Sequence, residues 1–202
     1  MNGKTGMKIG GLAVIAAVTA LLWPGGAIAE GPNWTFLEAG YQRMDVDDPM
    51  FDYKPDGFVV NGSFAFNDNF FMFGSYGIVE DRVFTGSDLE YTAWDAGLGY
   101  NVDLTENTDM FVAASYVWAE LDDGMFAIDD DGYGASLGIR SLVNSFDLGA
   151  AVEYVDFGGQ DGDDVSLSLG AAYFFNDYFA ACLNGNVGDD VTSYGLALRF
   201  AF

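Results

Sequence analysis

Histidine is absent from the sequence, and cysteine occurs only once, as Cys182. Without histidine, the serine–histidine and cysteine–histidine arrangements that serve most hydrolases and acyltransferases cannot be built. We therefore predict that the chain is not an enzyme and that it has no catalytic residue, cofactor or metal centre. A single cysteine also excludes an internal disulfide, so the cellular compartment must be inferred from other features.

Basic residues are scarce as well. Seven Lys and Arg stand against 31 Asp and Glu, which gives a formal net charge of −24. This balance excludes nucleic acid as a partner, because a phosphate backbone is bound by Lys and Arg. A disordered acidic chain is also excluded, since 50% of the residues are hydrophobic and 16% are aromatic.

One long apolar run is present, and it lies at the amino terminus. Lys4 and Lys8 precede the apolar residues 9–22, and an Ala-Ile-Ala sequence follows after a Trp-Pro-Gly-Gly break. A basic start, a short apolar centre and an Ala-x-Ala site are typical of a secretory signal peptide. We predict a cleaved leader of residues 1–29 and a single mature domain of residues 30–202, whose net charge is 5 minus 31, or −26.

Beyond the leader, apolar residues occupy every second position in one segment after another. In the last segment, Tyr194, Leu196, Leu198, Phe200 and Phe202 alternate with small or polar residues. Successive side chains of a strand point to opposite faces, so each segment is a ribbon with one apolar face. The predicted strands are residues 33–44, 57–66, 69–80, 89–102, 109–120, 131–142, 145–157, 163–175, 178–187 and 190–202. We predict ten strands, with eight as the alternative if 69–80 or 178–187 is miscounted.

The connections between these strands are of two kinds that alternate. One set is tight, as at Asn67-Asp68 and Val143-Asn144, and the other is mostly longer and acidic, as at 45–56 and 121–130. This alternation is typical of a membrane barrel with short periplasmic turns and longer outer loops. The strand lengths also fit a tilted membrane span of about 9–11 residues better than a sandwich strand of about 5–6.

These features predict an all-β, antiparallel, up-and-down transmembrane β-barrel. Its apolar faces would meet lipid, and its small and polar faces would fill the lumen. The alternative, a soluble β-sandwich, would have to pack all the large aromatics into one core about 10 Å thick. Aromatic residues near strand ends would form interfacial girdles. The girdle residues are Tyr41, Tyr100, Trp118, Tyr133, Tyr154, Tyr173 and Tyr178.

A series of short motifs carries a resemblance to a known group of proteins. In order, the motifs are EAGY, GSFAFNDNFFMFGSY, DAGLGYNV, GAAYFFNDYF and the terminal LALRFAF. With these motifs the chain resembles the small porin-like outer-membrane β-barrel proteins of Gram-negative bacteria, which include proteins once described as quorum-associated secreted factors. The resemblance covers essentially the whole mature chain. It implies export to the outer membrane, recognition of Phe202 by the outer-membrane assembly machinery, and no agreed biochemical activity.

Charged residues on the predicted lumen face are the candidate functional residues. They are Glu38, Asp95, Arg140, Asp147, Glu153 and Arg199. If Val143-Asn144 is a two-residue turn, Arg140 lies directly opposite Asp147, and Arg199 can meet Glu38 where the last strand closes on the first.

Two functions follow from these charges. They either fill the lumen of a protein with a structural or surface-interaction role, or line a narrow porin-like channel for small solutes. Cys182 falls on the same face and is predicted to be a small buried residue.

Acidic clusters in the longer loops suggest partners at the cell surface. The clusters lie at 45–48, 122–131 and 161–164, and none has the ordered twelve-residue calcium loop with its final Glu. We expect the loops to be solvated and mutually repelling. The alternative is that weakly bound divalent cations bridge the loops to outer-membrane lipopolysaccharide. The expected partners are outer-membrane lipid and lipopolysaccharide.

Overall fold

The structure, a computed structural model, describes residues 31–47, 52–82, 88–122, 124–158 and 162–202. The predicted leader and parts of four acidic loops lie outside these residues. The strands are β1 (Phe36–Asp47), β2 (Asp52–Tyr53), β3 (Asp56–Ala65), β4 (Phe70–Arg82), β5 (Asp88–Thr105), β6 (Thr108–Asp122), β7 (Ala127–Val143), β8 (Phe146–Asp156), β9 (Asp163–Phe174), β10 (Phe179–Val187) and β11 (Val191–Ala201).

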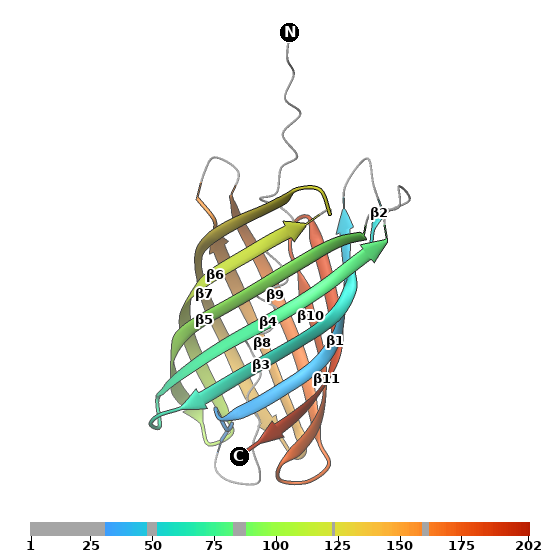
Figure 1. Cartoon of the computed structure of the whole chain (residues 1–202). Helices are drawn as coiled ribbons and strands as arrows, with labels where there is room; N and C mark the ends of the chain where they lie inside the picture. The colour runs from blue at the N-terminus through green and yellow to red at the C-terminus, as the bar shows by residue number, and fades with distance from the viewer. Residues whose placement is uncertain (1–30, 48–51, 83–87, 123, 159–161) are drawn as a thin grey trace.

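Ten long strands form a closed antiparallel barrel (Figure 1). Each strand pairs with its neighbour in sequence, except that the two-residue β2 pairs only with the end of β1. Closure comes from β1, which pairs with β3 on one side and with β11 on the other. This architecture confirms the predicted fold class and the count of ten barrel strands. Among the described residues, no helix is long and apolar enough to cross a membrane.

The barrel has two different ends. The hairpin turns after β3, β5, β7 and β9 lie at one end of the barrel, together with the carboxy terminus (Figure 1). This end is called the turn rim. The other connections lie at the opposite end, the loop rim. One of these is shorter than predicted, because β7 begins at Ala127 and places Asp129 and Asp130 in a strand paired with β6.

The turn between β7 and β8 differs from the prediction by one residue. Val143 pairs with Phe146, so the turn consists of Asn144 and Ser145 rather than of Val143 and Asn144. Asn144 adopts a φ of 56°. Tight two-residue hairpins require such a positive φ, which Asn tolerates far better than a β-branched residue such as Val.

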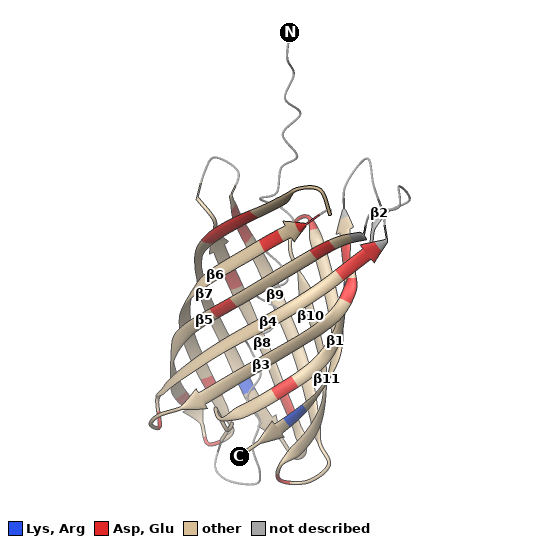
Figure 2. Cartoon of the chain, in the orientation of Figure 1, with Lys and Arg blue, Asp and Glu red and all other residues tan. Residues whose placement is uncertain are grey.

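The outer surface of the barrel is apolar between its two ends. Leu98, Leu196 and Leu198 are 61%, 68% and 67% exposed, and they belong to a large set of outward-facing Leu, Val, Phe and Tyr side chains. Acidic residues gather toward the loop rim (Figure 2). Soluble monomers rarely expose so large an apolar surface, which marks contact with a membrane or with another protein.

The interior is filled by side chains, with apolar groups at both ends. A loop-side cluster includes Met44, Val117 and Leu121, and a turn-side cluster includes Trp34 and Phe71. A polar layer of buried Ser, Asn and acidic residues lies between them. The sequence predicted a lumen of small and polar residues, and the two apolar clusters correct that prediction.

Candidate functional site: the interior charge network

A chain of four charged side chains crosses the barrel interior. The Arg140 guanidinium donates to both oxygens of Asp147, at 3.0 Å from Nε to Oδ1 and 2.6 Å from Nη2 to Oδ2. Arg199 lies 3.3 Å from Asp147 through Nη1 and 2.7 Å from Glu38 Oε2 through Nη2. Each of the four side chains is at most 1% exposed. The network therefore consists of paired charges that are removed from water.

Strand register explains how these pairs are brought together. Glu38 lies directly opposite Arg199 in the β1–β11 pair that closes the barrel, as the sequence predicted. Arg140 instead pairs with Gly149 across the β7–β8 hairpin, and its side chain reaches Asp147 diagonally. The prediction that Arg140 and Asp147 are directly opposite is therefore wrong, because the turn lies one residue later than expected.

The other two predicted lumen residues, Asp95 and Glu153, do not join this network. Asp95 accepts a hydrogen bond from the Ser75 hydroxyl, and Glu153 accepts one from Asn186 at 3.3 Å. Each keeps one buried carboxylate oxygen without a hydrogen-bond partner. Neither forms an ion pair within the described part of the chain. The polar layer thus contains two carboxylates without a basic partner.

An aromatic group surrounds the network on the turn side. Trp34 stacks on Phe71 with 4.2 Å between ring centroids, and it lies edge-on to Phe111 at 5.4 Å. The Arg140 guanidinium lies 5.1 Å from the Trp34 ring centroid. The Trp34 Nε1–H donates to Asp109 at 2.8 Å. Trp34 therefore ties the segment before β1 into the interior.

Sequence reasoning missed this aromatic group, although two signals were present. Extending the two-residue period backward from Glu38 through Phe36 places Trp34 on the lumen face. The run from Phe70 to Phe73 has bulk on both faces, so half of it must point inward. Both signals were hidden by the assumption that large apolar residues of a barrel face lipid.

Glycines on neighbouring strands make room for the inward rings. Phe71 lies opposite Gly99 and Phe73 opposite Gly97 in the β4–β5 pair. A Cβ atom on Gly99 would clash with the Phe71 ring. The space above Gly97 and Gly99 of β5 is thus filled by phenylalanine rings from β4. These glycines do not widen a pore.

Buried side chains close the middle of the barrel. A cavity of about 10 Å³ lies at the barrel wall, between inward residues such as Gln42 and Asn61 and the outward residues Tyr41 and Leu196, and it has room for about one water molecule. The Asn61 Oδ1 atom has no protein partner. Arg140, Arg199 and Asp147 have 0% exposed surface, and a passage wide enough for water would leave accessible surface on the residues beside it.

Cys182 is a free thiol that faces inward and is 2% exposed, which agrees with the predicted small buried residue. In the part of the chain that the structure describes, no group of three or more His, Cys, Asp or Glu residues is placed to hold a metal ion. Parts of the three acidic loop clusters lie outside the described residues, so divalent-cation binding there stays a prediction.

Comparisons with known proteins find similar solved structures at low sequence identity. No protein-family model and no curated protein matches the sequence. Neisserial surface protein A is 14% identical, with a TM-score of 0.46, over 84% of this chain and 98% of that one. Ail, the attachment invasion locus protein of Yersinia pestis, is 16% identical with a TM-score of 0.42, over 83% and 97%. An outer-membrane channel from Pseudomonas putida F1 is 14% identical with a TM-score of 0.49, over 90% and 100%. Identities of 14–16% and TM-scores below 0.5 do not establish a shared function.

Proposed function

We propose that the chain is an outer-membrane β-barrel protein of a Gram-negative bacterium, without enzymatic activity, which acts as a structural or surface-interaction protein. The observation that carries this proposal is the filled interior. Apolar clusters lie toward both ends of the lumen, and each side chain of the charge network is at most 1% exposed. With the lumen filled, the surfaces left to act are the outer wall and the loop rim.

Placement in a membrane is supported by the outer wall itself. A closed barrel satisfies its backbone N–H and C=O groups through neighbouring strands, which a bilayer requires. The outward Leu, Val and Phe side chains suit lipid, and Tyr100, Tyr173 and Tyr178 face outward near the turn rim. Trp118 and Tyr133 face outward nearer the loop rim, so aromatic residues occur at both interfaces of the proposed span.

Orientation follows from the two rims. In bacterial outer-membrane barrels the short turns are periplasmic and the longer loops extracellular. The acidic loop rim would then face outward, toward lipopolysaccharide and any divalent cations bound to it, and Phe202 would lie on the periplasmic side. Export would use the leader of residues 1–29.

Conductance measurements test the filled interior against the alternative, a narrow porin-like channel for small solutes. We expect mature protein refolded into a planar bilayer to show no reproducible single-channel steps. Incorporation is established separately by heat-dependent mobility on detergent gels. Reproducible steps that change in Arg140→Ala or Arg199→Ala, but not in the outer-surface variant Arg43→Ala, would show that solutes pass the network and that the channel function is correct.

A further inference from the structure

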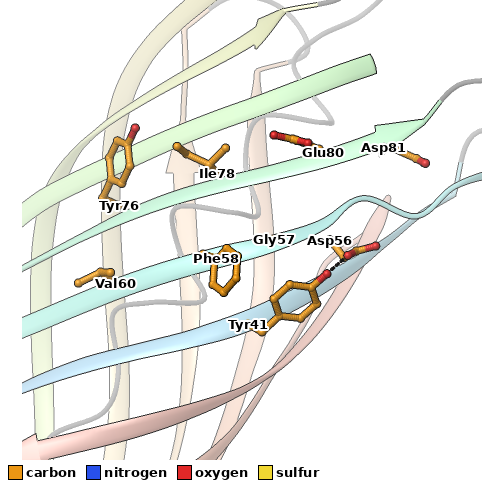
Figure 3. A pocket seen from close by; sticks show the side chains of 9 residues that line it. All are labelled: Tyr41, Asp56, Gly57, Phe58, Val60, Tyr76, Ile78, Glu80 and Asp81. Carbon is orange, nitrogen blue, oxygen red and sulfur yellow. Dashed lines mark hydrogen bonds between the residues drawn. The ribbon is translucent and has the colours of Figure 1, made fainter. Parts of the chain in front are cut away.

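A groove lies on the outer wall of the barrel near the loop rim, over β1, β3 and β4 (Figure 3). Its volume is about 770 Å³, which falls within the range of about 300–1,000 Å³ for small-molecule sites. It is separate from the interior charge network, because its floor consists of outward-facing side chains.

The floor of the groove is an apolar strip along two paired strands. Phe58 lies opposite Ile78, and Val60 lies opposite Tyr76, with all four side chains on the outer face. Tyr41 packs edge-on against Phe58, with ring centroids 5.3 Å apart. Phe58 remains 72% exposed. The strip is therefore an apolar surface open to the outside, on which Phe58 keeps most of its ring uncovered.

Carboxylates stand directly opposite one another at the mouth. Asp56 on β3 pairs with Glu80 on β4, and Glu80 pairs with Glu90 on β5. Like charges directly opposite on neighbouring strands are destabilising. Asp81, next to Glu80, also lines the groove (Figure 3). Three carboxylates thus line the groove where the apolar strip ends, and Glu90 lies beside them on β5.

Partners within the protein compensate only part of this charge. The Tyr41 hydroxyl donates to Asp56, and the backbone N–H of Lys54 donates to Asp81 at 2.8 Å. Arg43 lies opposite Asp56 on β1. Among the side chains that the structure describes there, Arg43 and Lys54 are the basic residues beside the four carboxylates, so acidic groups outnumber basic ones.

We infer that the groove binds a single-chain amphiphile with an ammonium head group. Its hydrocarbon chain would lie along Phe58 and Ile78, and its head group would lie between Asp56 and Glu80. Ion pairs at a membrane boundary are stronger than in water because the local dielectric constant is lower. An anionic lipid would instead place its phosphate against the carboxylates. This inference rests on the proposed membrane placement, which makes the floor face lipid and the mouth face the loop rim.

Isoleucine methyl groups allow a direct test, because residues 30–202 contain only three isoleucines and one of them, Ile78, lines the groove. The other two are Ile128 and Ile139. Mature protein labelled at the isoleucine δ1 methyl groups is refolded into phosphatidylcholine nanodiscs and titrated with dodecyltrimethylammonium. We expect a saturable shift of the Ile78 signal. Ile139, an outward residue of β7 that is 50% exposed, reports non-specific partition into the bilayer. Dodecyl sulfate, which has the same chain and the opposite charge, should not saturate Ile78.

Variants test the role of the carboxylates. Glu80→Gln should weaken dodecyltrimethylammonium binding about fivefold, which corresponds to the loss of one partly exposed ion pair. Glu120→Gln is the matched control, because Glu120 lies on the outer face of β6 toward the same rim and does not line the groove. It should leave the affinity unchanged.

Several outcomes would overturn the inference. Equal shifts of Ile78 and Ile139, equal saturation by dodecyl sulfate, or equal effects of the two variants would each mean that the groove holds ordinary bilayer lipid. A chain that does not enter the nanodiscs overturns the proposed membrane placement and this inference with it. A chain that enters them and shows no preferential Ile78 shift overturns this inference alone.

Discussion

Arg199 takes part in two of the three ion pairs that the described residues form inside the barrel. Taking its guanidinium out of water costs free energy, which its bonds to Glu38 and Asp147 must offset. Buried pairs of this kind contribute little net stability, but removing one partner leaves a buried charge uncompensated. The effect of a substitution therefore depends on whether the opposite charge is removed as well.

We predict that Arg199→Ala lowers the free energy of unfolding by about 3–5 kcal/mol, because Glu38 loses its ion pair. Urea unfolding of the refolded protein in lipid vesicles measures this change. The control Arg43→Ala removes an exposed arginine from the outer face and should cost at most about 1 kcal/mol. The double variant Glu38→Gln with Arg199→Met should recover part of the loss. A cost below 1 kcal/mol for Arg199→Ala would contradict the network described above.

Trp34 gives a second prediction, for the aromatic group beside the network. Trp34→Ala should cost about 3–5 kcal/mol, because it leaves a cavity between Phe71 and Phe111. Trp34→Phe keeps much of the ring but leaves the Asp109 carboxylate without its indole donor, which should cost about 1–3 kcal/mol. The same urea experiment measures both. If Trp34→Ala unfolds at the wild-type urea concentration, Trp34 does not pack inside the barrel in solution.

Paired strands position these side chains, and β4 with β5 shows how. Phe71 and Phe73 of β4 each lie over a glycine of β5. The phenylalanine ring occupies the space that a side chain on β5 would otherwise fill. Glycine weakens a strand through lost conformational entropy. Here the buried area of the covering ring offsets that loss, as in the pairing of aromatic residues with strand glycines used to stabilise designed sheets.

We predict that Gly99→Ala is destabilising by about 1–3 kcal/mol, because the new methyl group displaces the Phe71 ring from a filled interior. Gly62→Ala is the matched control. A Cβ atom there meets its nearest neighbour, the Leu37 Cδ1 atom, at an ordinary 3.8 Å, so the variant should be neutral or slightly stabilising. Unfolding of both variants in vesicles measures the difference, and equal stabilities would show that Phe71 does not rest on Gly99.

The sequence predicted strands better than it predicted what fills the barrel. Alternation placed all ten barrel strands within four residues of their observed ends, because a lipid-facing or inward-facing side chain repeats every second residue. The β7–β8 turn lies one residue later than predicted, which moves the partner of Arg140 by two residues, from Asp147 to Gly149; the register depended on a turn conformation that Asn144 adopts. The inward position of Trp34 was not predicted, although the predicted strand 33–44 contains it, because large apolar residues were expected to face lipid and its ring partners lie on the distant strands β4 and β6.

At the scale of the whole molecule, the last residue of the chain meets the segment just before β1. The Phe202 backbone N–H donates to the Thr35 carbonyl at 3.3 Å, and its side chain is 60% exposed at the turn rim. Phe202 stacks on Phe200, with ring centroids 5.4 Å apart. Its ring is therefore accessible from outside, which a recognition signal requires and which the fold itself does not.

We predict that Phe202→Ala lowers the amount of barrel assembled in the outer membrane of an expressing bacterium several-fold, because the assembly machinery loses its signal. Refolding of the purified variant into lipid vesicles should match the wild type, since the exposed ring contributes little to stability. Heat-dependent gel mobility measures both. An equal loss in the cell and in vesicles would show that Phe202 acts on folding and not on recognition.

Closure of the barrel also has a consequence for the order of events during biogenesis. Glu38 and Arg199 are 161 residues apart in the chain, whereas Arg140 and Asp147 are only 7 apart. The local pair can form with its own hairpin, but the distant pair must wait until the last strand has been synthesised and has found the first. Until then Glu38 lacks its basic partner, and a lipid environment strongly disfavours such an uncompensated charge. Entry into the bilayer and pairing of β1 with β11 should therefore occur as one cooperative step. The Glu38–Arg199 pair then favours insertion of the closed barrel over insertion of an open sheet.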